Sequence, residues 1–368
     1  MVRSTRLKRL WILGCALAGV ATVSLCVAAI IVWARDDSSS DRTPSSLGAE
    51  TAVGLELERT VSGPGVVAVS ADGEILAIAH RADVALWDLR SGDRLRSLNH
   101  SGSAGNVNTM AFSRDGEYLA AGTDNGYVSI WNARSGAWIG EAQAAGNFVS
   151  TVSFTASGDL VAAPNEIAGP GTLITWDATR NWLAREFRVS IISPGIVASA
   201  ENGPLVYTVT SRHTGEIREG VEGGALATHI TEWDTESAEK TRSLKPAFSP
   251  LSDTQSLAVT DDGKTLAGAT YDAIWVWDLS TDRVDHAFET GEEITFVDIS
   301  PNGRQIFTID FLSGRLRVWD ASSGQELEVS LPNKTPALTN LEGLAVTPDG
   351  ERLVTSGPEV RIWTLVFS

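Results

Sequence analysis

The segment nearest to a phosphate-binding motif is Gly263-Lys264-Thr265, which matches the last three positions of such a loop. A phosphate-binding loop also needs a glycine five residues before Gly263, and that position holds Ala258. The apolar pattern predicts a strand on both sides of the segment, whereas a phosphate-binding loop leads into a helix. We therefore interpret the segment as a hairpin turn.

Histidines and carboxylates are the other residues whose chemistry could make a site. No two histidines have the spacing that places metal ligands together on one element; the five are His80, His100, His213, His229 and His286. His213 and His229 flank a stretch with Glu216, Glu219 and Glu222, which is compatible either with a metal site or with a hydrated acidic loop. Without a matching ligand spacing, we predict no metal and no cofactor.

Nucleophilic catalysis also has little support. Both cysteines, Cys15 and Cys26, lie in an apolar N-terminal segment, so the rest of the chain has no thiolate chemistry. No Gly-x-Ser-x-Gly sequence is present to form a hydrolase nucleophile elbow. The sequence therefore predicts a protein that is not an enzyme.

One short phrase recurs along the chain and predicts how it is built. Runs similar to Val84-Ala85-Leu86-Trp87-Asp88 recur along the chain, and the intervals between their successive tryptophans are 44, 45, 57, 44, 42 and 44 residues. Repeats of this length indicate an architecture of stacked identical units, in which the phrase is buried core. The recurring residues are Trp87, Trp131, Trp176, Trp233, Trp277, Trp319 and Trp363.

Each repeat predicts four short antiparallel strands. In the second repeat the strands are expected at 107–112, 118–122 and 127–131, with a fourth that begins at Ala137. Asp-Gly or a similar pair follows the first strand, where positive φ is tolerated. These turns are Asp72-Gly73, Asp115-Gly116, Ser157-Gly158, Asn202-Gly203, Asp262-Gly263, Asn302-Gly303 and Asp349-Gly350.

From about Leu55 to the C-terminus, these turns and tryptophans resemble the WD-repeat β-propellers. The family's Gly-His ahead of the first strand is mostly absent, with Asn99-His100 as the faint exception, so the His-to-Asp bond of many family blades is not expected. The Ser-Pro-Asn-Gly turn at 300–303 also resembles turns of bacterial propellers, and we expect a bacterial source.

The resemblance implies an all-β fold, a seven-bladed β-propeller. The alternating segment Leu55–Val61 reads as an outermost strand that no blade precedes, and the last blade ends soon after Trp363. We therefore expect the N- and C-terminal segments to pair and close the ring, which protects exposed strand edges.

The N-terminus predicts a membrane anchor. Residues 1–10 form a basic tail, and residues 11–34 run without a charge, which is longer than the roughly 20 residues that span a bilayer. A cleaved signal peptide, with a shorter apolar region, is the alternative. Basic residues before the span place the N-terminus in the cytoplasm and the propeller outside the cell membrane. Residues 35–53 are expected to be a disordered linker, and residues 54–368 the propeller.

Charge and loops define the expected partners. The chain has a formal net charge of −17, and residues after position 35 carry 46 acidic and 24 basic side chains, so nucleic acid is not an expected partner.

The fourth repeat is longer than its neighbours, with an insertion at 211–224 between its second and third strands, and the third repeat has a Pro/Gly-rich loop at 164–171. Such loops lie on one face of a repeat protein, often the binding face, although surface insertions are also tolerated without a partner. The candidate partner-binding residues are Arg212, His213, Glu216, Arg218, Glu219, Asn165 and Glu166.

Together these features predict a monomeric, membrane-anchored, non-catalytic scaffold or recognition module that binds protein partners. Two alternatives stay open. One is a propeller enzyme, a hydrolase or lyase, with its site in the central channel, because fold alone does not decide function. The other is the sensory ectodomain of a membrane signalling complex.

Overall fold

The computed structural model describes residues 52–99, 105–144, 148–165, 172–177, 183–188, 197–199, 205–213, 226–244, 256–260, 262–270, 273–281, 283–331 and 338–368. Within these ranges every regular element is a β-strand, as expected for an all-β fold. None of these residues belongs to a helix that could cross a membrane. The predicted basic tail, the predicted anchor at 11–34 and residues 35–51 of the predicted linker lie outside the described ranges.

The strands follow one another in runs of four, and within a run each strand pairs antiparallel with the next. The first two runs are β2 (Val66–Val69), β3 (Ile75–His80), β4 (Asp83–Asp88), β5 (Arg94–Leu98), then β6 (Val107–Phe112), β7 (Tyr118–Thr123), β8 (Tyr127–Asn132), β9 (Trp138–Gln143). The next two are β10 (Phe148–Phe154), β11 (Leu160–Asn165), β12 (Thr172–Asp177), β13 (Leu183–Arg188), then β14 (Val197–Ser199), β15 (Leu205–His213), β16 (Leu226–Asp234), β17 (Glu239–Leu244). Then come β18 (Ser256–Val259), β19 (Thr265–Ala269), β20 (Ala273–Asp278), β21 (Arg283–Glu289), and β22 (Ile294–Ile299), β23 (Gln305–Asp310), β24 (Leu316–Asp320), β25 (Glu326–Ser330).

The last run combines the two ends of the described chain. β26 (Gly343–Val346), β27 (Arg352–Ser356) and β28 (Val360–Phe367) are completed by β1 (Ala52–Ser62), which pairs antiparallel with β28. β1 also pairs in parallel with β25 over residues 52–54, so two runs merge into one eight-stranded sheet. The pairing of N- and C-terminal segments is as expected, but the strand begins at Ala52, inside the segment predicted to be a linker.

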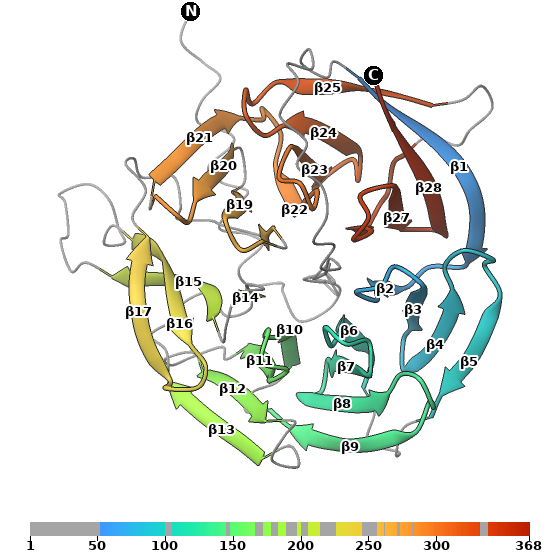
Figure 1. Cartoon of the computed structure of the whole chain (residues 1–368), viewed down its shortest axis with the longest axis vertical. Coiled ribbons are helices and arrows are strands. Elements are labelled where there is room, and N and C mark those ends of the chain that lie inside the picture. Colours follow the sequence, from blue (N-terminus) through green and yellow to red (C-terminus); the bar gives the residue numbers. More distant parts are fainter. Residues whose placement is uncertain are drawn as a thin grey trace, which may run out of the picture.

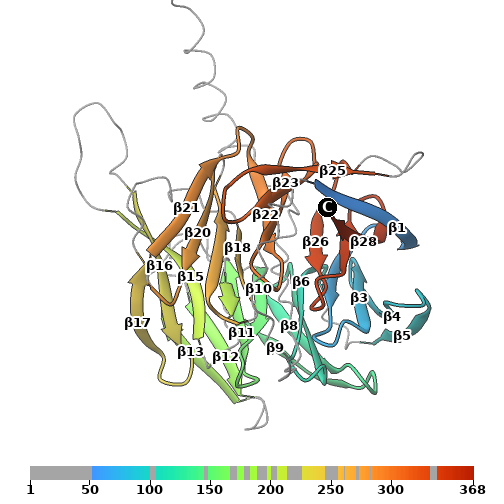
Figure 2. The ribbon, with the colours of Figure 1, turned by 45° about the horizontal axis from the view of Figure 1, so that its top comes forward.

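The sheets are arranged as a closed ring, which makes the fold propeller-like. Figure 1 shows them around a centre toward which β2, β6, β10 and β14 lie, and Figure 2 shows the same ring tilted. The first strand of each run contacts the first strand of the next run along the chain, and β26 contacts β2 to complete the circle. Each sheet therefore packs between two neighbours, which explains why consecutive residues of a strand are both buried.

The recurring tryptophans lie in the core, as predicted. Trp131, Trp277 and Trp363 are among the largest fully buried side chains. Trp176 and Trp319 are also buried, whereas Trp87 and Trp233 are half-buried. Several of the indole N–H groups donate to threonine hydroxyls of the preceding strand, as Trp363 does to Thr355 Oγ1 at 2.9 Å.

The turn after the first strand is built differently from the prediction. Positive φ occurs at the glycine alone, for example +64° at Gly116, and not at the residue before it. Asp115 acts as an acceptor: its Oδ1 receives Ser113 Oγ at 2.6 Å and the Glu117 amide at 2.9 Å. The same hydrogen bond from a hydroxyl to the side-chain oxygen of an Asp or Asn recurs in the pairs Ser70–Asp72, Thr260–Asp262, Ser300–Asn302 and Thr347–Asp349.

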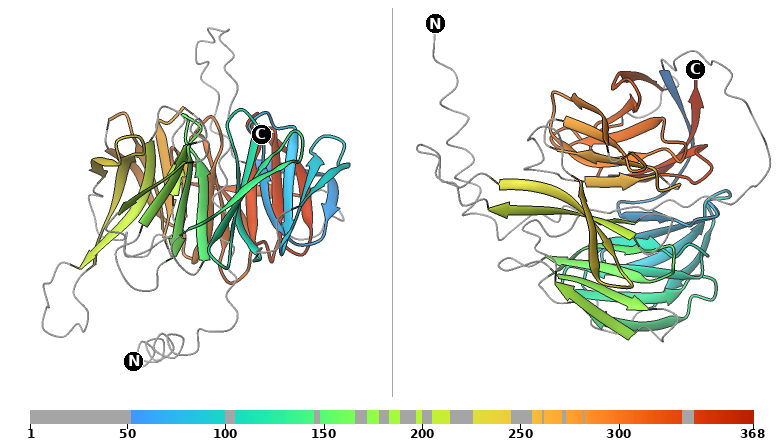
Figure 3. Two further views of the ribbon diagram at one scale, coloured as in Figure 1. Left: turned by 90° about the horizontal axis from the view of Figure 1, so that it is seen from below. Right: turned by 60° about the vertical axis from the view of Figure 1, so that its left-hand side comes forward.

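The predicted insertion in the fourth repeat is in part strand. β15 and β16 have nine residues each, and Arg212 and His213 pair with Ala227 and Leu226. The hairpin extends beyond its neighbours in Figure 3. The expectation that residues 211–213 are loop is therefore wrong, because cross-strand hydrogen bonding continues the ladder. Asn165, also expected in a loop, pairs with Phe148 at the end of β11.

Candidate binding site

One face of the ring carries both the connections between sheets and the turns between second and third strands. The amide of Val107, at the start of β6, donates to the Arg81 carbonyl in the β3–β4 turn at 2.8 Å. The Phe311 amide, in the β23–β24 turn, donates to the Glu293 carbonyl in the connection before β22 at 2.7 Å. This confirms that second-to-third-strand loops and sheet-to-sheet connections share a face, which we call the connection face.

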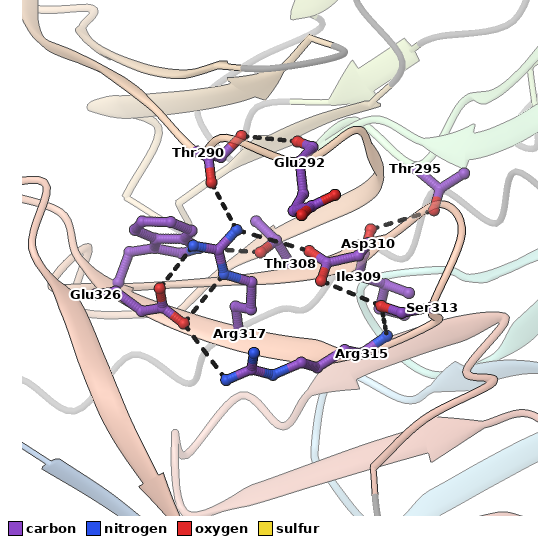
Figure 4. Close-up of polar contacts among 11 residues, drawn as sticks. Thr290, Glu292, Thr295, Thr308, Ile309, Asp310, Ser313, Arg315, Arg317 and Glu326 are labelled. Atoms are coloured by element: carbon purple, nitrogen blue, oxygen red, sulfur yellow. Dashed lines mark hydrogen bonds and ion pairs between the residues drawn. The ribbon is translucent and has the colours of Figure 1, made fainter.

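A pocket of about 430 Å³ lies on this face at the β22–β25 run. One wall is the connection at 290–293 and the other is the β23–β24 turn with the start of β24. Its lining residues are Thr290, Gly291, Glu292, Glu293, Asp310, Leu312, Ser313, Arg315 and Arg317. Figure 4 shows most of them around the Arg317 guanidinium.

Arg317 is the fixed centre of the pocket. Its Nε and Nη2 donate to the two carboxylate oxygens of Glu326 at 3.0 and 2.6 Å, a bidentate pair, and Nη1 donates to the Thr290 carbonyl at 2.8 Å. The guanidinium lies 4.2 Å from the centroid of the Trp319 ring. The hydrogen bond from Arg317 holds the pKa of Glu326 below its usual range. The arginine therefore ties β24 to β25 and to the connection before β22.

Asp310 has a buried carboxylate oxygen without a hydrogen bond. Its side chain is 8% exposed, and its Oδ1 has no hydrogen-bond partner. The Arg317 Nη1 atom is 3.9 Å from this oxygen, too far for a hydrogen bond, while Oδ2 accepts Ser313 Oγ at 3.2 Å. Burial raises the pKa of Asp310, and the nearby Arg317 opposes that rise.

Further charges surround Asp310. Glu292 and Glu293 project from the connection, and among the described residues neither side chain takes part in a hydrogen bond or an ion pair. Burial raises the pKa of Glu293. Arg315 Nη2 lies 3.8 Å from Glu326 Oε1, so both arginines of the pocket are engaged by the same carboxylate.

An apolar ledge adjoins the pocket. Phe311 and Leu312 occupy the β23–β24 turn and are 42% and 84% exposed. The equivalent β7–β8 turn has Asp124-Asn125-Gly126, so the apolar pair is not a requirement of the turn. Exposed apolar residues rimmed by polar ones are typical of interaction sites.

The sequence did not identify this site. Its residues fall in a repeat of ordinary length, whereas the prediction rested on the longer loops. Phe311-Leu312 inside a turn, with two arginines before Trp319, was the available signal. Of the predicted binding residues, Arg212, His213 and Asn165 lie in strands, and Glu166, Glu216, Arg218 and Glu219 lie outside the described residues. The strand ends at Asn165 and His213 are both second-strand ends, the ends that lead to the connection face.

The central strands offer few chemical groups. Along the described strands β2, β6, β10, β14, β18, β22 and β26, the ionisable residue is Asp298, which is 4% exposed. It accepts backbone N–H groups from Ile299 at 2.8 Å and from Val346 on β26, in the next run of strands, at 3.1 Å. The described residues contain no cluster of three His, Cys, Asp or Glu side chains able to hold a metal ion.

Comparison with known proteins supports the WD-repeat resemblance. Residues 92–132 match the family model described as WD domain, G-beta repeat. The β-propeller domain of Cps50 (Swd1) from Myceliophteria thermophila superposes with a TM-score of 0.66 at 16% identity, over 85% of this chain and 100% of that one. This likeness shows the fold, a β-propeller.

Curated relatives are similar over part of their length. The Dictyostelium discoideum periodic tryptophan protein 2 homolog is 25% identical over 79% of this chain, which spans 32% of that protein. The Schizosaccharomyces pombe target of rapamycin complex subunit wat1 is 31% identical over 67 residues, 18% of this chain and 21% of its own. The chain thus spans about a third or less of each. Both are eukaryotic proteins, so the expected bacterial source gains no support from them.

Proposed function

We propose that the chain is a seven-bladed WD-repeat propeller that acts as a non-catalytic scaffold, or recognition module, for protein partners. The observation that carries the proposal is the connection face, where a polar pocket and an exposed Phe311–Leu312 ledge lie together. A relative whose name describes it as a complex subunit is consistent with it. The inner strands lend no support to a central-channel enzyme, because among their described residues Asp298 is the ionisable one and it is buried.

Partner capture tests the proposal. Crosslinking of intact cells that express the full chain should reproducibly capture a specific protein, which mass spectrometry identifies. The purified full chain and this purified protein should then bind each other directly. Deletion of residues 214–224 should remove that protein if the long hairpin contributes to binding. The deletion leaves Arg212 and His213 in place because they pair with Ala227 and Leu226. Failure to recover any specific protein would contradict the scaffold function.

We further propose that residues 11–34 anchor the chain in the cell membrane, with the N-terminus in the cytoplasm and the propeller outside. Support comes from the uncharged run and the basic residues that precede it. The full chain should sediment with membranes and be labelled by a membrane-impermeant reagent, and a variant without residues 1–34 should not sediment. Labelling by a permeant reagent alone would place the propeller on the cytoplasmic side.

A further inference from the structure

We propose that the pocket beside Arg317 receives a cationic side chain, a lysine or an arginine, from a peptide segment of a protein partner, with the neighbouring apolar residue of that segment on the Phe311–Leu312 ledge. The proposal rests on the scaffold function and assigns it a site and a ligand chemistry.

The first support is the unsatisfied oxygen of Asp310. Asp310 lines the pocket, and its buried Oδ1 lacks a hydrogen-bond partner, because the Arg317 Nη1 atom that forms an ion pair with it lies 3.9 Å away. A buried carboxylate oxygen that has lost water without gaining a donor costs free energy. A donor with a positive charge, entering from the pocket, would satisfy this oxygen and gain a charge-assisted hydrogen bond.

The second support is the charge of the lining. Three carboxylates, Asp310, Glu292 and Glu293, line the pocket, and the latter two form no hydrogen bond or ion pair with the described residues. The two arginines offset them only in part, because Glu326 outside the lining adds a fourth carboxylate and engages both arginines. The pocket therefore presents a net negative set of groups to solvent.

The arrangement also argues against an anionic ligand. The Nε, Nη1 and Nη2 atoms of Arg317 already donate to Glu326 and to the Thr290 carbonyl, and its aromatic contact with Trp319 fixes the guanidinium plane. An anion bound to Arg317 would have to break that bidentate pair, and an anion bound to Arg315 would compete with Glu326 and lie beside three further carboxylates.

The ledge specifies what lies next to the cation. Leu312 lines the pocket and is 84% exposed, and Phe311 beside it is 42% exposed. Covering these two side chains removes apolar surface from water, which favours binding. A basic residue followed or preceded by an apolar residue therefore fits the site better than a run of basic residues.

A peptide titration of the full-length protein tests the site. The first probe is the fluorescent peptide Gly-Ser-Arg-Leu-Ser-Gly. In two further probes lysine or citrulline replaces the arginine, and in a fourth alanine replaces the leucine. Fluorescence anisotropy should show binding of the arginine or lysine peptide, a loss of about tenfold or more with citrulline, which keeps the shape without the charge, and a smaller loss with alanine.

Protein variants locate the effect. Asp310→Asn and Glu292→Gln should each weaken binding of the cationic peptide about tenfold. Asp285→Asn, which removes an exposed carboxylate on β21 away from the pocket, is the matched control and should leave affinity unchanged. Glu292 is exposed, so its variant keeps the test valid if Asp310→Asn impairs folding.

The outcomes separate this inference from the scaffold function. Equal affinity for the citrulline and arginine peptides, no binding of any peptide, or equal effects of Glu292→Gln and Asp285→Asn would overturn the cation site. If Glu292→Gln reduces the yield of the crosslinked partner no more than Asp285→Asn does, the scaffold function stands and the assignment of this pocket fails.

Discussion

At the scale of residues, the buried tryptophans differ in their hydrogen bonds. Trp363 Nε1 donates to Thr355 Oγ1, whereas Nε1 of Trp275, which is equally buried, has no hydrogen-bond partner. Replacing Trp363 leaves the Thr355 hydroxyl without its hydrogen-bond donor. Replacing Trp275 leaves no polar group without a partner, because its indole N–H forms no hydrogen bond.

Trp363→Phe should therefore destabilise the protein by about 1–3 kcal/mol more than Trp275→Phe, the control with a similar loss of volume. The free energy of unfolding in urea measures both. Equal losses would mean that volume alone decides the cost.

Asp298 predicts a pH dependence of stability. Burial raises its pKa to about 7, and the N–H groups of Val346 and Ile299 limit the rise. Because the folded-state pKa lies above that of the unfolded chain, the folded state binds the proton more tightly. The contribution to stability is complete below about pH 4 and is lost as the pH rises to about 7.

Asp298→Asn removes this titration. The stability of the variant relative to wild type should rise by on the order of 2–4 kcal/mol from about pH 4.5 to about pH 8. Thermal unfolding of the variant and of the wild type at both pH values measures this difference in stability. The other acidic groups are common to both proteins, so their effects cancel in the difference. A difference that stays constant between the two conditions would show that Asp298 does not titrate there.

At the scale of elements, strand order and tryptophan positions could be predicted, and the bonding within turns could not. The recurring tryptophan phrase marks the third strand of each run, since its apolar pattern and period are visible in the sequence. The acceptor role of Asp115 requires the hydroxyl of Ser113 two residues earlier, which the Asp-Gly signal does not contain. The strands at Arg212 and His213 depend on cross-strand pairing that composition does not reveal. The pocket was missed because it joins residues from two separate connections.

The closing strand β1 is held by a polar contact as well as by its ladder. Glu58 Oε1 accepts Arg352 Nε at 2.9 Å and Thr364 Oγ1 at 2.7 Å, which joins β1 to β27 and β28. Both Glu58 and Arg352 are about one-fifth exposed, so solvent weakens this ion pair only in part.

Glu58→Ala should lower the free energy of unfolding by about 1–2 kcal/mol. Glu56→Ala, on the same strand but exposed, should change it by less than about 0.5 kcal/mol. Chemical unfolding followed by tryptophan fluorescence tests the pair. Similar losses in both variants would assign the effect to strand propensity.

At the scale of the whole molecule, the ring depends on contacts between distant parts of the chain. Removal of residues 1–62 takes away β1 and exposes the edge of β28, and such an edge invites association with other chains. We expect this truncation to aggregate and to unfold at lower temperature. Removal of residues 1–51, which leaves β1 complete, is the control and should stay monodisperse by light scattering. Equal behaviour of the two truncations would show that β1 is dispensable.

The pairing of β1 with β28 has a consequence for synthesis. Among the described strands, β1 is synthesised first and its partner β28 last. About 300 residues lie between them, so roughly 15–60 s pass before β28 is made, at ~5–20 residues per second. During that interval a nascent chain displays β1 without its antiparallel partner β28. A chain that stops before β28 keeps the edge of β1 exposed, and an exposed edge invites association with other chains. Ring closure thus reports that translation has reached the end of the propeller.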